Sequence, residues 1–169
     1  MAISVRLNPR EEHEAKILAR DTTKICRMQN TTPRGEEGRD ESDLLGTRAE
    51  FAVAKLFGLD RPKFNVLGDE GKDLWFGNQS IDVKFTQGKG ETDLIFDSLE
   101  AFRADVAILV TSDGDDFIVH GGVSKERFDS ASYEKRKFFG MKMCMNVTEL
   151  CPIEAVWKHL RQQQIKEDL

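Results

Sequence analysis

One short segment, residues 80–86, constrains the fold of this chain more than any other. Apolar side chains stand at positions 81, 83 and 85, and the polar residues Asp82, Lys84 and Thr86 alternate with them. Successive side chains of a β-strand point to opposite faces of its sheet. The pattern therefore predicts a strand with one apolar face, which another layer must cover, and one polar face.

Two helices are predicted before this strand. The first begins at Asn8, a capping residue followed by one proline and nearby glutamates, and extends to about Met28. The second begins at Ser42, carries an apolar stripe and ends at Gly58. Residues 29–41 between them are rich in Thr, Pro, Gly and charge, which is typical of a mobile loop.

The rest of the chain alternates short strands with turns. Further strands are expected at 64–67, 73–76, 94–96, 106–111 and 117–120, and a last helix at 152–165. This order predicts one α/β (α+β) domain with a central mixed β-sheet of four to five strands, flanked by helices. We expect an N-terminal helix and loop at 1–41, a central core at 42–121 and a C-terminal helical region at 122–169.

The composition suits a soluble globular protein, with 39% apolar and 33% charged residues. The longest apolar run, 106–110, is too short to span a membrane, and no secretion signal is visible. The three cysteines are odd in number and widely spaced, so we expect free thiols in a reducing, cytoplasmic compartment. The formal net charge of −5 argues against holding nucleic acid by bulk charge, but it does not exclude a metal-assisted enzyme.

Asp82 and Lys84 are the first candidates for chemistry. On one strand they share a face and lie roughly 7 Å apart. Burying charge is costly unless pairing or function offsets that cost. The pattern therefore fits either a functional site or a salt-bridged, half-exposed strand face.

Two more carboxylates can join them. The turn at 77–78 lets the strand that Asp73 opens pair with the next one, which would place Asp73 beside Asp82. Glu50 lies at the edge of the apolar stripe of its helix, so it can point toward the polar end of the sheet. The alternatives are a turn aspartate and an ordinary surface glutamate.

This ordered set resembles the PD-(D/E)xK nuclease superfamily, the restriction endonuclease-like fold of many restriction enzymes, junction resolvases and phage exonucleases. The resemblance rests on residues 46–50, 68–73 and 81–84, in the order helix Glu, strand Asp and strand Asp-x-Lys. Lys72 stands where the nominal motif has proline, which is the looser part of that motif.

The resemblance implies a role for each residue. Asp73, Asp82 and the backbone carbonyl of Val83 would bind Mg²⁺, with Mn²⁺ as a substitute, and Glu50 would complete the shell directly or through water. Lys84 would position or help to deprotonate the attacking water. A metal-dependent phosphodiesterase acting on DNA is implied, and the resemblance does not choose between an endonuclease, a junction-resolving enzyme and an exonuclease. Because the chain is short enough for a single compact domain, we expect an endonuclease or junction-resolving enzyme of phage or mobile-element type.

Substrate contacts are expected just beyond the strand, at Thr86, Gln87 and Lys89. Residues 133–139 interleave basic and aromatic side chains, which suits either a nucleic-acid surface or a solvated helix with its Phe residues in the core. His120 can face the site or serve a structural role.

Because a duplex has two strands to cut, a homodimer is a reasonable arrangement. The alternative functions are an inactive binding or assembly module on the same fold and an RNA-directed nuclease.

Overall fold

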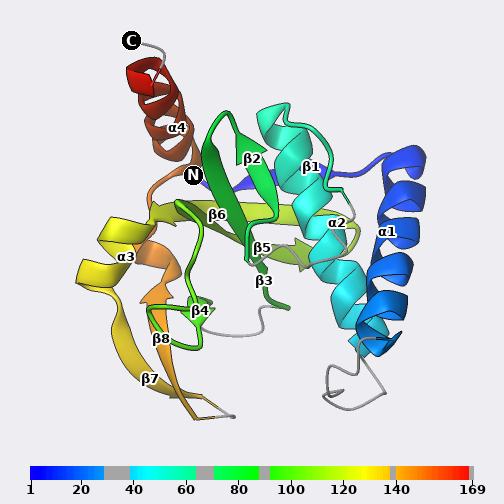
Figure 1. Cartoon of the computed structure of the whole chain (residues 1–169), viewed down its shortest axis with the longest axis horizontal. Coiled ribbons are helices and arrows are strands. Elements are labelled where there is room, and N and C mark those ends of the chain that lie inside the picture. The colour runs from blue at the N-terminus through cyan, green and yellow to red at the C-terminus, as the bar shows by residue number, and fades with distance from the viewer. Residues whose placement is uncertain (29–38, 64–70, 88–91, 138–139, 168–169) are drawn as a thin grey trace.

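The computed structural model describes residues 1–28, 39–63, 71–87, 92–137 and 140–167 (Figure 1). In chain order the elements are β1 (Ile3–Arg6), α1 (Pro9–Met28), α2 (Arg39–Phe57), β2 (Leu74–Phe76), β3 (Gln79–Phe85), β4 (Asp93–Phe96), β5 (Val106–Asp113), β6 (Asp116–Ser124), α3 (Lys125–Ala131), β7 (Tyr133–Lys137), β8 (Gly140–Asn146), a 3₁₀ turn (Val147–Glu149) and α4 (Ile153–Glu167). The strand expected at 64–67 falls outside the described residues, and so does most of the loop expected at 29–41.

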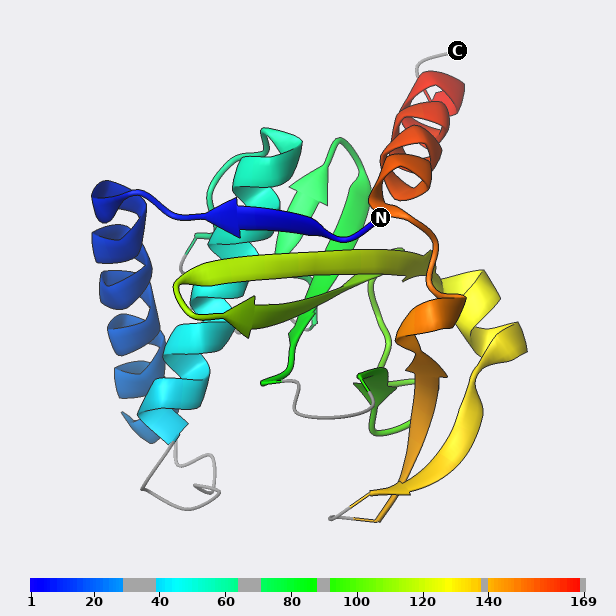
Figure 2. The same ribbon diagram turned by 180° about the vertical axis from the view of Figure 1, so that it is seen from behind.

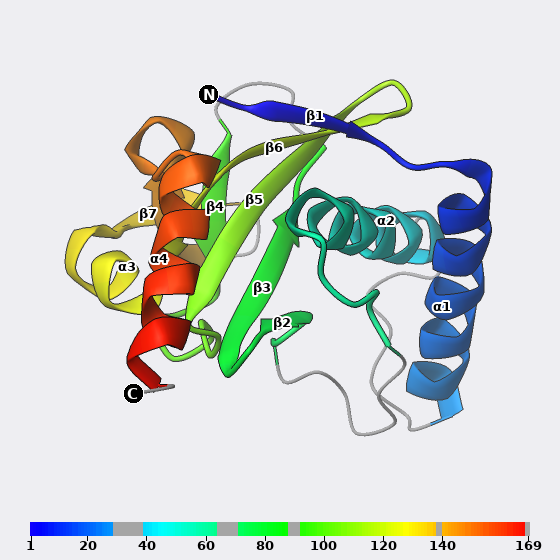
Figure 3. The ribbon, with the colours of Figure 1, turned by 90° about the horizontal axis from the view of Figure 1, so that it is seen from above.

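A five-stranded sheet with the order β1-β6-β5-β3-β2 forms the centre of the fold. Only its β3–β5 pair is parallel, and the other pairs are antiparallel. This confirms the expected α/β class with a mixed central sheet. Figure 3 shows β2 at one edge of this sheet, next to β3, with α1 packed outside α2.

A second sheet of three strands, β4-β8-β7, was not expected. Figure 2 shows β7 and β8 as a long hairpin that extends away from the central sheet. The region 122–169, which was expected to be helical, contains the helices α3 and α4, but that prediction is wrong for the strands β7 and β8 between them. The partly buried residues of β7, Lys135 and Lys137, are charged and pair with a buried carboxylate. A search for apolar periodicity therefore misses this strand.

The central sheet separates two apolar cores. One core lies between the sheet and the helices α2 and α4, and it contains Val53, Ile81 and Leu160. The other lies between the sheet and the β4-β8-β7 layer, and it contains Leu94, Phe102 and Phe128. None of the helices in the described ranges combines the length and apolarity that a membrane span requires.

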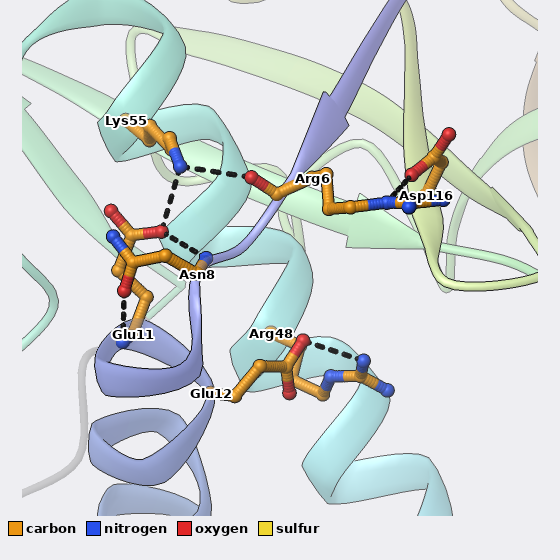
Figure 4. A network of polar contacts seen from close by, with 7 residues as sticks. All are labelled: Arg6, Asn8, Glu11, Glu12, Arg48, Lys55 and Asp116. Atoms are coloured by element: carbon orange, nitrogen blue, oxygen red, sulfur yellow. Dashed lines mark hydrogen bonds and ion pairs between the residues drawn. The ribbon is translucent and has the colours of Figure 1, made fainter.

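The joint between β1 and α1 follows the expected capping chemistry. The side chain of Asn8 accepts from the Glu11 N–H at 2.9 Å, and the Glu11 carboxylate accepts from the Asn8 N–H at 2.7 Å (Figure 4). Lys55 of α2 donates to the Glu11 carboxylate and to the Arg6 carbonyl, and Arg48 pairs with Glu12 at 2.7 Å. These contacts fix α1 against α2.

The second helix begins earlier than the sequence suggested. Its first residue is Arg39, so Ser42 lies inside the helix and does not cap it. The prediction assigned residues 39–41 to the loop because they are charged and not apolar. An acidic residue such as Glu41 is, however, favourable in the first turn of a helix, near the positive end of its dipole.

Position 121 on β6 requires glycine because the backbone of another segment lies very close to it. A Cβ added there would lie 2.5 Å from the Cys151 carbonyl oxygen. We therefore expect Gly121→Ala to lower the free energy of unfolding by about 1–3 kcal/mol, the usual cost of overpacking.

Chemical denaturation would measure this change. Gly46→Ala is the matched control, since a Cβ at Gly46 on α2 meets no atom within 4 Å. That control should be neutral or stabilising by about 0.5–1 kcal/mol, because alanine favours the helix. Equal stabilities for the two variants would contradict the assigned role of the β6 contact.

Candidate active site

Asp82 and Lys84 form an ion pair on β3. Asp82 is 1% exposed, and its Oδ1 lies 2.8 Å from the Lys84 Nζ. The Lys84 side chain is 37% exposed, and its Nζ lies 4.9 Å from the ring centre of Phe96 on β4. The pair thus joins a buried carboxylate to an ammonium that still reaches solvent.

The register of β3 against β5 shows which face carries this pair. Asp82 lies opposite Ala107 and Lys84 opposite Leu109, both of which belong to the core beneath the β4-β8-β7 layer. Neighbouring residues in register on paired strands share a face of the sheet. Asp82 and Lys84 therefore lie on the face of the central sheet that the second sheet covers, whereas α2 packs on the other face.

Asp73 precedes β2 and reaches the neighbouring strand. Its Oδ2 accepts from the Val83 N–H at 2.6 Å, and its own N–H donates to the Ile81 carbonyl at 2.9 Å. The N–H and C=O of one strand residue point to the same side. The Asp73 carboxylate and the Val83 carbonyl therefore lie along the same edge of β3. The carboxylate binds the peptide that follows Asp82, and the carbonyl belongs to the next peptide.

Gly71 adds space beside this carboxylate pair. Its φ is +77°, a left-handed conformation that favours glycine, and a Cβ there would lie 3.6 Å from Asp82 Oδ2. A Cβ at this distance would make an ordinary van der Waals contact and would occupy the space next to the oxygen. The closeness of Gly71 to Asp82 was not predicted from the sequence.

Glu50 occupies a partly buried position on α2, between the buried residues Ala49 and Phe51. Its helix packs on the Ile81 and Val83 face of β3, the face opposite to Asp82. Among the residues that the structure describes, no three His, Cys, Asp or Glu side chains form a group able to hold a metal ion. The placement of Glu50 in the shell therefore stays a prediction.

Comparisons with protein-family models, with curated proteins and with solved structures find no match. The resemblance to PD-(D/E)xK nucleases thus rests on the residues of this chain alone.

The donor chemistry around β3 fits a hard divalent cation. Asp73, Asp82 and the Val83 carbonyl offer oxygen ligands, and Gly71 leaves room beside Asp82. Mg²⁺ is usually held by one or two carboxylates together with water and substrate phosphates, so two aspartates suffice in principle. Mn²⁺ accepts the same oxygen ligands.

The expected substrate residues lie past the end of β3. Thr86 is partly buried, and its N–H donates to the Val110 carbonyl at 3.0 Å, which ties it to β5. Gln87 is exposed. Lys89 lies outside the described residues.

The basic and aromatic segment at 133–137 is a strand, so the alternative of a solvated helix is wrong. Lys135 and Lys137 both donate to the buried Asp93, at 3.0 and 2.7 Å. These two lysines therefore stabilise the second sheet. The remaining part, 138–139, is outside the described residues.

His120 lies at an irregularity between β5 and β6, and its Nε2 is 2.8 Å from the Thr111 hydroxyl. Burial lowers the pKa of this imidazole, which keeps it neutral at pH 7. The sequence left open whether His120 faces the active site or has a structural role. The contact with Thr111 supports the structural role.

Proposed function

We propose that this protein is a metal-dependent nuclease that hydrolyses phosphodiester bonds of DNA, as an endonuclease or a junction-resolving enzyme. The observation that carries the proposal is the cluster at β3. A buried Asp82 pairs with a half-exposed Lys84, and the Asp73 carboxylate bonds the peptide directly after Asp82. Carboxylates can hold a metal that activates water, and an ammonium can stabilise charge on a phosphoryl group, so this arrangement supports metal-assisted phosphodiester hydrolysis.

Each residue has a separate task in this proposal. Asp73, Asp82 and the Val83 carbonyl would hold Mg²⁺ or Mn²⁺, and Glu50 would support them directly or through water. The bound metal would supply a more acidic water and neutralise charge on the phosphoryl oxygens. Lys84 would release Asp82 Oδ1 when the cation binds and would then orient the attacking water or contact a phosphate oxygen.

A duplex offers two strands, and we infer that two copies of the chain act on it as a symmetric dimer. We place its activity in the cytoplasm, where the free thiols of Cys144 and Cys151 stay reduced. Sedimentation velocity with and without duplex DNA would test the dimer. A monomer under both conditions would exclude it.

A nuclease assay tests the proposal directly. Supercoiled, linear, single-stranded and four-way-junction DNA, and RNA, would each be incubated with Mg²⁺, Mn²⁺ or EDTA. We expect cleavage of at least one DNA substrate with a divalent ion and none with EDTA, because the carboxylates alone supply no activated water. The matched control is the Asp82→Asn protein, purified in parallel to reveal any contaminating nuclease.

The pattern of substrates separates the alternatives. Cleavage of RNA alone would support an RNA-directed nuclease. Binding without cleavage under any metal condition would support an inactive binding or assembly module, and the nuclease proposal would then be abandoned.

A further inference from the structure

Trp75 is a large aromatic side chain left open to solvent at the edge of the central sheet. It is 53% exposed and lies on β2, the last strand in the sheet order. The other tryptophan, Trp157 on α4, stacks on Phe57 with ring centres 5.0 Å apart and so belongs to the core. About half of the Trp75 surface is therefore accessible to solvent.

The register places Trp75 beside the candidate active site. Trp75 lies opposite Ser80, and Ser80 and Asp82 share a face of β3 because they are two residues apart. Diagonal neighbours of this kind lie roughly 7–8 Å apart. Trp75 is thus on the same face as Asp82, about the width of one nucleotide from it.

A lysine accompanies the ring. The Lys72 Nζ lies 5.7 Å from the ring centre of Trp75, within the range of a cation–π contact. Lys72 also directly precedes Asp73 in the chain. An exposed ring and an ammonium therefore stand together on the side of the site where β2 begins.

We propose that Trp75 and Lys72 bind one unpaired nucleotide next to the scissile phosphate, with the base stacked on Trp75 and the adjoining phosphate held by Lys72. This rests on the proposed function and adds the substrate class to it. Aromatic stacking accepts any base and supports binding of single strands. A base inside a duplex has both faces covered by its neighbours, so the ring selects flaps, gaps, frayed ends or unpaired bases at a junction.

Fluorescence offers a direct test because the chain has only two tryptophans. In a Trp157→Phe protein, Trp75 is the sole reporter. Single-stranded oligonucleotide, added with EDTA to prevent cleavage, should quench its emission, whereas a blunt duplex of equal length should quench far less. Absence of quenching by the single strand would overturn the inference.

Affinity provides the second readout. We expect Trp75→Ala to weaken binding of single-stranded oligonucleotide by about 5- to 100-fold, the loss of one stacked base. Lys72→Ala should reduce the slope of log K against log salt by about one phosphate contact. The matched control is Trp157→Phe, which should bind like the wild type. Unchanged affinity in Trp75→Ala would show that Trp75 is only an exposed surface residue.

The two proposals fail in different ways. Cleavage of DNA by the wild type together with unchanged binding in Trp75→Ala would overturn the stacking role and leave the nuclease intact. Quenching that depends on Trp75, without cleavage under any metal condition, would support this binding surface and overturn the catalytic proposal.

Discussion

Replacement of Lys84 by alanine is expected to lower the rate of DNA cleavage by at least about 10²-fold, while Mn²⁺ binds with nearly unchanged affinity. The ammonium lies 2.8 Å from Asp82 in the structure and is not itself a metal ligand. In the proposed mechanism this ammonium orients the attacking water or contacts a phosphate oxygen, so its loss should slow cleavage. The variant keeps Asp73 and Asp82, the two carboxylates proposed to hold the metal. Single-turnover cleavage and Mn²⁺ binding followed by electron paramagnetic resonance would measure the two effects.

Lys125 supplies a matched control for this variant. Its side chain is 36% exposed, its Nζ lies 3.0 Å from Asp129, and it stands 5.4 Å from the ring centre of Phe102. Lys125→Ala therefore removes a lysine with the same kinds of contact from another part of the protein, and it should leave cleavage unchanged.

Asp82→Asn should differ from both lysine variants, because it alters a proposed metal ligand and should weaken Mn²⁺ binding and cleavage together. If Lys84→Ala cleaved DNA at the wild-type rate, the role assigned to Lys84 would be refuted. If it lost metal binding to the same degree as Asp82→Asn, Lys84 would be a structural partner of the carboxylate and not a group that acts on substrate.

The elements with strong apolar periodicity were predictable from the sequence. The strand at 80–86 and the helix starting at Asn8 occur nearly as expected, since alternation and capping are local properties. β7 was not predictable in this way. Its lysines satisfy Asp93, which lies more than 40 residues earlier in the chain, so the cause of its burial pattern is a long-range contact.

The candidate site was likewise predictable where it depends on local sequence and not where it depends on long-range packing. The turn between β2 and β3 brings Asp73 to the Val83 peptide, and that short connection was readable from the sequence. Whether Glu50 can reach the candidate site depends on how α2 packs across the sheet. No local sequence pattern determines that packing. Trp75 was overlooked because its exposure, and its position beside Asp82, follow from β2 being an edge strand.

Asp93 should make the second sheet sensitive to acid, and Asp93→Asn is expected to lower the free energy of unfolding by about 3 kcal/mol at pH 7. Burial acts to raise the pKa of this carboxyl, but the hydrogen bonds from Lys137 and Lys135 outweigh burial, and the pKa is lowered. The side chain of Asp93 is fully buried, so its removal leaves two lysines that have lost their counter-charge.

The lowered pKa fixes the direction of the pH dependence. The contribution of Asp93 is fully present above the carboxyl's unfolded pKa of about 3.9, and it is lost as the pH falls through the lower folded value. Below that value the protonated acid and the amide of Asp93→Asn are both neutral, so the stability difference between wild type and variant should shrink toward zero. Urea unfolding at a series of pH values from 7 to 2 would follow this difference.

The matched control for this experiment is Asp97→Asn. Asp97 also pairs with a lysine, Lys142, but its side chain is 66% exposed, and exposed ion pairs contribute only about 0–1 kcal/mol. Its effect should be small at every pH. A stability loss in Asp93→Asn that stays constant down to pH 2 would mean that packing of the carboxyl, and not its charge, holds β4 to β7. Because Phe96 of β4 lies against Lys84, a β4 loosened by acid should also weaken the candidate active site.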